Sequence, residues 1–214
     1  MKKRIICSII IVMVVLAATM VGYATIQNDP PQERVQVEKT VPEPKPLIIE
    51  KVPTKEELEA RHLEKCAKEY PTATKIWRYM REELGWNNYV CAGVMGNIMA
   101  ECGGQTLMID PDLYDSSGSY YGICQWSKRW NPEVIGTDIN YQLKYIKGTV
   151  ESEFETFGYL YQKGFNYEQF TKLENAEEAA LAFAASYERC SSKTYYIREE
   201  NAVKAYDYFV LYSH

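Results

Sequence analysis

The sequence has very little histidine, and this limits the chemistry that it can perform. His62 and His214 are the only histidines among 214 residues, and neither a CxxC pair nor an HExxH motif occurs. Zinc enzymes and Cys-His peptidases take their metal ligands or their base from histidines inside the folded domain. We therefore expect neither of these chemistries, no metal and no cofactor.

Positive charge is also in short supply. The chain has 24 Lys and Arg against 29 Asp and Glu, which gives a formal net charge of −5, and its second half has no basic stripe interleaved with aromatics. Such a stripe is the usual signature of a nucleic-acid-binding protein. We therefore do not expect nucleic acid as a partner. With 46% hydrophobic residues and no visible internal repeat, one globular domain is expected.

One long stretch near the N-terminus has no charge at all. Residues 5–24 read IICSIIIVMVVLAATMVGYA and follow the basic cluster MKKR. The run is long enough to cross a bilayer as a helix, and the basic flank should stay on the cytoplasmic side. We expect residues 1–26 to be a membrane anchor or a signal peptide. The rest of the chain would then face outward, either anchored to the membrane or secreted after cleavage.

The composition changes after this segment. Residues 27–53 contain six of the chain's 9 prolines and no helical or alternating pattern, which is typical of an extended linker. Residues 54–70 then read as a charged lead-in helix, because Thr54 and Glu57 have the spacing of a capping box. Residues 71–214 form the remaining domain.

Within that domain the apolar spacing is mostly helical. We expect helices over 73–84, 88–102, 138–147, 150–163, 174–189 and 194–212. Only SSGSYYGICQW, at 116–126, has the turn residues and the aromatic and β-branched run of a strand pair. The predicted class is mainly α (α+β), with one small β-hairpin.

A single glutamate stands out where one of these helices ends, in GNIMAECGG at 96–104. Val90, Val94 and Ile98 recur every four residues, and Glu101 follows at the C-terminal edge of this apolar stripe. Partial burial and the negative end of the helix dipole would both raise its pKa, which suits a general acid. A glutamate in a last helical turn is nevertheless more often a solvated surface residue.

Two later motifs follow this glutamate along the chain. The first is YYGICQW, and the second is AALAFAASYERC with its Tyr187-Glu188 pair, before a helix that bears Arg198. In this order, with the stretches IWRYM and AGVMGNIMAE, the motifs resemble the lysozyme superfamily. The sequence is most similar to the phage tail-type lysozyme domain, which is related to goose-type lysozymes and soluble lytic transglycosylases. The resemblance covers about residues 73–210.

This resemblance implies a lysozyme-like helical fold and peptidoglycan glycan strands as the partner. Glu101 would protonate the oxygen of the β-1,4 bond between N-acetylmuramic acid and N-acetylglucosamine, in a muramidase facing the cell wall. Such chemistry commonly uses two carboxylates. Where animal-type lysozymes carry an aspartate just before the Tyr-Gly of the hairpin, this chain has Tyr120.

The second carboxylate therefore has to come from elsewhere, and Asp115 in IDPDLYD is the best candidate for a base, although loop aspartates are more often turn formers. If no aspartate takes part, the reaction would be that of a lytic transglycosylase, in which the muramic 6-hydroxyl attacks and leaves a 1,6-anhydro end. A non-catalytic glycan-binding module that keeps the same fold is the alternative from another class.

Candidates for substrate binding are Gln125, Tyr121 and Tyr187. An amide in a cleft-side strand can bind acetamido groups, and the resemblance places Gln125 near Glu101. Tyr121, Trp126 and Trp130 could equally be core aromatics. On the exported side, at least one disulfide is expected among five cysteines, which are Cys66, Cys91, Cys102, Cys124 and Cys190.

Overall fold

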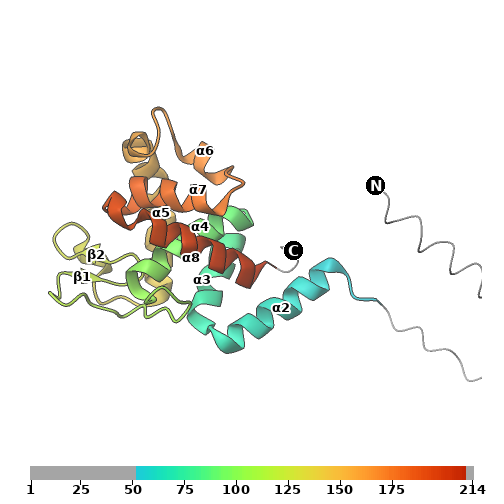
Figure 1. Ribbon diagram of the computed structural model, residues 1–214. Coiled ribbons are helices and arrows are strands. Elements are labelled where there is room, and N and C mark those ends of the chain that lie inside the picture. The colour runs from blue at the N-terminus through green and yellow to red at the C-terminus, as the bar shows by residue number, and fades with distance from the viewer. Residues whose placement is uncertain (1–51, 211–214) are drawn as a thin grey trace, which may run out of the picture. The chain divides into compact units, whose positions relative to one another are not determined.

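The computed structural model describes residues 52–210. The expected membrane segment, 5–24, and nearly all of the proline-rich linker lie outside the described residues. Between residues 52 and 210, no helix combines the length and the apolar character needed to cross a bilayer. The fold below is that of the domain that follows the linker (Figure 1).

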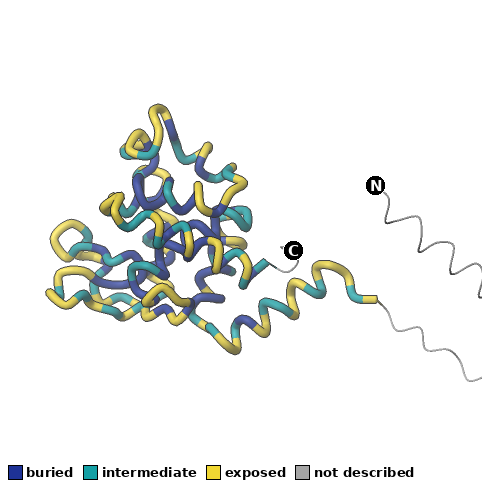
Figure 2. Tube along the Cα trace, in the orientation of Figure 1, coloured by how far each residue is buried: buried dark blue, intermediate teal, exposed yellow. Residues whose placement is uncertain are grey.

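The first two helices begin where local sequence signals place them. Helix α2, Lys55–Glu69, has the predicted capping box, in which Glu57 N donates to Thr54 Oγ1 and Thr54 N donates to the Glu57 carboxylate. Most of its residues are exposed or half-buried (Figure 2), and it contacts the last helix through His62, whose ring nitrogen lies 2.7 Å from Tyr208 O. Helix α3, Pro71–Glu82, starts with a proline in its first turn, where no backbone N–H is required.

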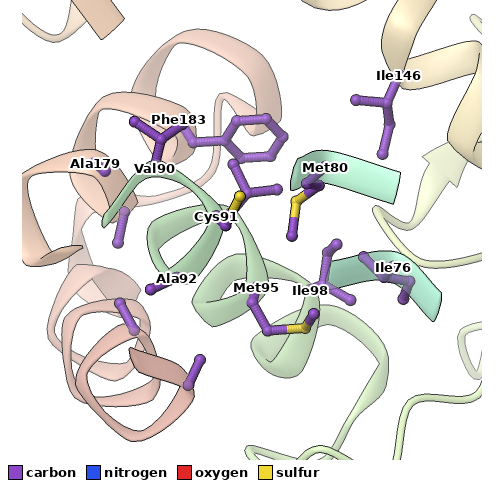
Figure 3. Close-up of a cluster of buried hydrophobic side chains, with 14 of the residues drawn as sticks. Ile76, Met80, Val90, Cys91, Ala92, Met95, Ile98, Ile146, Ala179 and Phe183 are labelled. Atoms are coloured by element: carbon purple, nitrogen blue, oxygen red, sulfur yellow. The ribbon is translucent and has the colours of Figure 1, made fainter. Parts of the chain in front are cut away.

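Helix α4, Asn88–Cys102, is the centre of the domain. Asn87 caps it by accepting a hydrogen bond from Val90 N, 3.0 Å away. Of its 15 residues 11 are buried, as expected of a core helix surrounded by others. Figure 3 shows Ile98 and Met95 of α4 beside Ile76 and Met80 of α3, in one continuous hydrophobic cluster.

Two glycines allow other helices to approach α4 closely. A Cβ at Gly93 would lie 2.6 Å from atoms of Ala179, and a Cβ at Gly96 would lie 2.6 Å from Ala202 N. These contacts join α4 to α7, Ala176–Phe183, and to α8, Tyr195–Phe209. The three helices lie together in the body of the domain (Figure 1), and this packing fixes the position of the C-terminal end of α4.

The β-hairpin is small, as predicted. Strands β1, Tyr120–Tyr121, and β2, Trp126–Ser127, pair antiparallel with Tyr121 opposite Trp126. The buried Gln142 holds the hairpin against the next helix, because its Oε1 accepts from Ile123 N at 3.0 Å while its Nε2 donates to two loop carbonyls. The turn of the hairpin is thereby fixed relative to the helical core.

The sequence prediction that residues 138–163 form two helices was wrong. A single helix, α5, Ile139–Phe157, replaces the two helices expected over 138–147 and 150–163. One glycine in a helix interior costs only about 1 kcal/mol, and here the buried Ile146, Val150 and Phe154 continue the apolar stripe past Gly148. A short helix, α6, Tyr167–Thr171, was not predicted, although Asn166 and Gln169 form its capping box.

The segment expected as one helix over 174–189 changes its geometry part-way. Helix α7 ends at Phe183 and continues directly as the π-helix η3, Ala184–Glu188, after which Arg189 adopts a left-handed backbone with φ 53°. Shorter 3-10 segments complete the fold at η1, Pro132–Val134, η2, Gly158–Leu160, and η4, Ser192–Thr194.

The expectation of a disulfide was wrong for the described part of the chain. All five of its cysteines are free thiols. Two of the buried thiols donate to backbone carbonyls, Cys91 to Trp86 O at 3.7 Å and Cys102 to Ile98 O at 3.4 Å. They behave as small apolar side chains with a weak donor, a common role for a buried free cysteine.

Candidate active site

A cleft of about 550 Å³ opens beside the end of α4. The hairpin, the middle of α5 and the π-helix η3 supply its other walls. A cleft of this volume is in the range that binds small-molecule or short oligomeric ligands. Of the residues that the sequence singled out, Glu101, Asp115, Gln125 and Tyr187 line it together, and Tyr121 does not.

Glu101 occupies the last turn of α4, where the core helix reaches the cleft. The helix ends at Cys102, and Gly103 follows, packed so closely that a Cβ there would collide with the Thr106 carbonyl oxygen. The Glu101 side chain is 20% exposed, so it is accessible from the cleft and largely shielded from water. Burial raises the pKa of this carboxyl, and the nearby guanidinium of Arg198 opposes the rise.

Arg198 is the direct partner of Glu101. It extends from α8, and its guanidinium donates a hydrogen bond to Glu101 Oε1 in an ion pair whose arginine side chain is only 6% exposed. Charge-assisted hydrogen bonds of this kind fix the orientation of a carboxylate. The close approach of α8 to α4 at Gly96 is what brings the two side chains together.

A second glutamate, Glu188, lines the same cleft. It is the last residue of the π-helix η3, and its Oε1 atom is buried. Burial raises the pKa of Glu188 well above its ordinary value, and the neighbouring charge of Glu101 adds to the rise, while Arg198 opposes it. π-helical turns are rare and often mark functional sites, and here the turn delivers a carboxyl to the cleft.

Gln125 lines the cleft with a backbone φ of 46°, a left-handed conformation that is uncommon outside glycine. Its amide nitrogen donates to Leu113 O at 3.1 Å and to Gly122 O at 3.0 Å. These bonds hold the side chain against the hairpin backbone, so the amide nitrogen stabilises the hairpin. Arg189, at φ 53°, is a second cleft residue in this conformation, and such local strain clusters at functional sites.

The two predicted tyrosines have different surroundings. Tyr187 is buried, lines the cleft, and stacks on Phe183 with 4.7 Å between ring centroids, while its hydroxyl lies 3.0 Å from Thr149 Oγ1. Tyr121 is also buried, and its hydroxyl donates to Thr137 O at 2.7 Å and to Asp112 Oδ1 at 3.0 Å. Tyr121 thus braces the hairpin from inside the fold.

Comparison with known protein families identifies the family of this domain. The sequence model of the phage tail lysozyme family matches residues 71–209. The chain belongs to the phage tail lysozyme family. The family match covers nearly the same residues as the predicted resemblance and confirms it. A comparison with curated proteins gave no match. Family membership indicates a lytic enzyme that acts on peptidoglycan.

In this family member, Asp115 lies at the cleft but is tied to its own loop. Its carboxylate accepts hydrogen bonds from Ser117 N at 3.0 Å, Ser119 N at 2.7 Å and Tyr120 N at 2.8 Å, and also from the Ser117 hydroxyl. These bonds, led by that of Ser117, lower the pKa of Asp115 to about 2. A carboxylate with this pKa is a weak base near neutral pH.

Trp126 of the hairpin and Trp130 after it both line the cleft but differ in exposure. Trp126 is buried against Tyr145, at 5.7 Å between ring centroids, in agreement with a core role. Trp130, in contrast, is 71% exposed at the cleft, and the Arg129 guanidinium lies 4.7 Å from its ring. An exposed indole at a cleft can stack on a ligand.

Sequence reasoning missed the catalytic potential of Glu188 and Arg198, although both occur in the motifs that carried the family resemblance. The available signal was for Glu188, which directly follows the apolar run AALAFAASY. Such a run predicts burial, and buried charges are normally paired.

Proposed function

We propose that this chain is a peptidoglycan glycosidase that cleaves the β-1,4 bond between N-acetylmuramic acid and N-acetylglucosamine, with Glu101 as its general acid. One observation carries the proposal: Glu101 presents a shielded carboxyl, with a pKa raised by burial, to the open cleft of a phage tail lysozyme domain. A general acid works best when its pKa lies near the working pH.

In the proposed reaction, a glycan strand lies in the cleft with its scissile oxygen at Glu101. Transfer of the Glu101 proton to that oxygen breaks the bond to the sugar carbon, which takes on oxocarbenium character. The resulting Glu101 carboxylate is stabilised by Arg198, which already donates to it in the free protein. The ion pair thus stabilises the state that exists immediately after proton transfer.

Two ways of completing the reaction remain to be compared. In hydrolysis, water adds to the sugar carbon with the help of a second carboxylate, and the family name supports this route. The second candidate is a lytic transglycosylase, in which Glu101 acts as acid and then as base. The loop bonding of Asp115 favours this candidate, because Asp115 is then not needed as a base.

Product analysis separates these two reactions. Mass spectrometry of the released muropeptides should show reducing muramic ends if water is the acceptor, and 1,6-anhydromuramic ends if the 6-hydroxyl is. Reducing glucosamine ends would place the cut at the other glycosidic bond and contradict the proposed bond specificity.

The role of Glu101 is tested by Glu101→Gln in the full chain, assayed by loss of turbidity of a peptidoglycan suspension. Glutamine can still accept a hydrogen bond from Arg198 but has no acidic proton to donate. We expect activity to fall by at least about 100-fold, since general acid catalysis usually contributes this much or more.

Glu82→Gln provides the matched control, because Glu82 also lies in the last turn of a helix but is exposed and away from the cleft. It should retain full activity. A Glu101→Gln protein within tenfold of wild type would show that another group is the acid. A wild-type chain that binds peptidoglycan without cleaving it would instead support a non-catalytic glycan-binding module.

A further inference from the structure

The ion pair between Glu101 and Arg198 conflicts with the proposed use of Glu101 as an acid. A carboxyl that accepts a hydrogen bond from a guanidinium is held in its ionised form. A general acid, however, must carry its proton when the substrate arrives. The site therefore needs a feature that weakens the hold of Arg198 on Glu101 without removing the arginine.

Two unmatched polar atoms lie at the same place in the fold. Among residues 52–210, Glu188 Oε1 and Arg198 Nε are both buried, and neither has a hydrogen-bond partner. One is a carboxyl oxygen and the other an N–H donor, so the two groups are chemically complementary. Leaving such groups unpaired is costly in a protein interior, and unsatisfied pairs of this kind call for an explanation.

The count of charges around the two glutamates points the same way. Two carboxyl groups face one guanidinium in a largely water-excluded part of the cleft. Like charges in one site oppose each other's ionisation, so the pair retains a proton that either carboxyl alone would lose. The macroscopic titration then belongs to the pair and not to either residue.

The other titratable groups nearby compensate only in part. Arg189, which is paired with Glu153 of α5, and a hydrogen bond with the Cys124 side chain both act to lower the pKa of Glu188, but burial and the charge of Glu101 outweigh them. Burial also raises the pKa of the thiols around the pair, which keeps them neutral. The thiols come from the end of α4, from the hairpin and from the loop after η3; they are Cys102, Cys124 and Cys190.

We propose that Glu188 is a positioning residue that shares one proton and Arg198 with Glu101. In the free protein the proton resides on Glu188, and the Glu101 carboxylate accepts from Arg198. When a glycan strand enters, the proton moves to Glu101 and the guanidinium turns its Nε donor to the Glu188 carboxylate. The number of protons in the pair is unchanged, and Glu101 then carries the proton that it transfers to the glycosidic oxygen. This inference rests on the proposed function of Glu101.

The test is the pH profile of kcat/KM for the full chain on solubilised glycan strands. Glu188→Gln removes the charge that opposes Arg198, so Glu101 should lose its proton at lower pH. We expect the basic limb of the profile, above which kcat/KM falls, to move down by about 1–2 pH units in the variant. At a pH above the basic limbs of both proteins, kcat/KM of the variant should be about 10- to 100-fold lower than that of wild type, and acidification should restore it. Arg198→Met should move the limb upward, and Arg198→Lys should restore it towards wild type.

Glu200→Gln is the matched control, since it removes an exposed carboxyl from the same helix as Arg198 and outside the cleft. Its profile should equal that of wild type. Three results with folded Glu188→Gln protein would overturn the proposal. They are an unchanged profile, an equal loss at every pH, which a purely structural role would give, and complete inactivity at every pH, which would make Glu188 a reacting group.

A measurement without substrate separates this inference from the proposed function. Carboxyl ¹³C NMR titration of the free full chain, assigned with Glu101→Gln and Glu188→Gln, should show that the titration midpoint of Glu188 falls when residue 101 is glutamine, because the charge that opposes ionisation of Glu188 is then removed. If wild type cleaves no peptidoglycan, the proposed function fails, while the titration still decides whether the two carboxyls share a proton. Independent titration of the two groups would refute the shared proton even in an active enzyme.

Discussion

Replacing Gly96 by alanine tests whether the close packing of α8 on α4 maintains the active site. A Cβ at this position would lie 2.6 Å from Ala202 N and 2.6 Å from the carbonyl oxygen of Arg198. Both contacts are with backbone atoms, which cannot rotate away as a flexible side chain could. The two helices would therefore have to separate, and Arg198 would move with α8.

The expected effect on stability is the difference between two opposing contributions. Alanine is favoured over glycine in a helix interior by up to about 1 kcal/mol. Overpacking a core typically costs about 1–3 kcal/mol, and a backbone contact this short lies towards the upper end. We expect Gly96→Ala to lower the free energy of unfolding by about 1–2 kcal/mol, which corresponds to a decrease in Tm of roughly 2–8 °C for a domain of this size.

Gly148→Ala in α5 is the matched control, because no atom lies within 4 Å of the added Cβ. Here only the helix preference remains, so Tm should rise by roughly 1–4 °C. Calorimetry gives both values, and peptidoglycan clearing well below Tm should be reduced only in Gly96→Ala. If Gly96→Ala also raised Tm and kept full activity, the tight packing between α4 and α8 would not be needed for the site, and the reasoning above would be refuted.

Two further predictions concern the rim of the cleft. Trp130→Ala should raise KM by about 2- to 10-fold with kcat nearly unchanged, because aromatic stacking contacts are worth about 0.5–1.5 kcal/mol. Tyr159→Ala is the control, because Tyr159 is also highly exposed but lies outside the cleft, and an unchanged KM in Trp130→Ala would exclude sugar contact at Trp130. Asp115→Asn should cost less than tenfold in activity and lower Tm at neutral pH. Because the pKa of Asp115 is lowered from 3.8 to about 2, this Tm difference should be full above about pH 4 and vanish as the pH falls through 2. A loss of activity above tenfold would instead show that Asp115 is the base.

The features that the sequence predicted correctly are those with a local physical cause. The capping box at Thr54 and the end of α4 before Gly103 each depend on residues within one or two helical turns. The position of Glu101 followed from the same kind of signal, because the apolar stripe of α4 leads directly to it. Local hydrogen bonding and periodicity were sufficient for these features.

The wrong predictions concern features that tertiary contacts decide. Separate helices were expected over 138–147 and 150–163, but buried residues on both sides of Gly148 hold α5 together across it. Five cysteines in a segment expected to be exported suggested a disulfide, but four of the thiols are buried in the core, and those of Cys91 and Cys102 donate to carbonyls. In both cases the local signal was weaker than the packing that surrounds it.

The pairing of Glu101 with Arg198 and Glu188 was beyond sequence reasoning for a more specific reason. Residues 182–187 are all buried, so the hydrophobic pattern does not distinguish one face of the helix from another. The π-turn at η3 then places more residues in one turn than an α-helix would, and this changes the direction in which Glu188 points. Arg198, 97 residues after Glu101, meets it only because Gly96 admits α8. The proposed acid is therefore encoded locally at the end of one helix, whereas the proposed control of its proton depends on how three separate segments pack. Substitutions at Gly96 and at Glu188 should accordingly both alter the pH at which Glu101 can act.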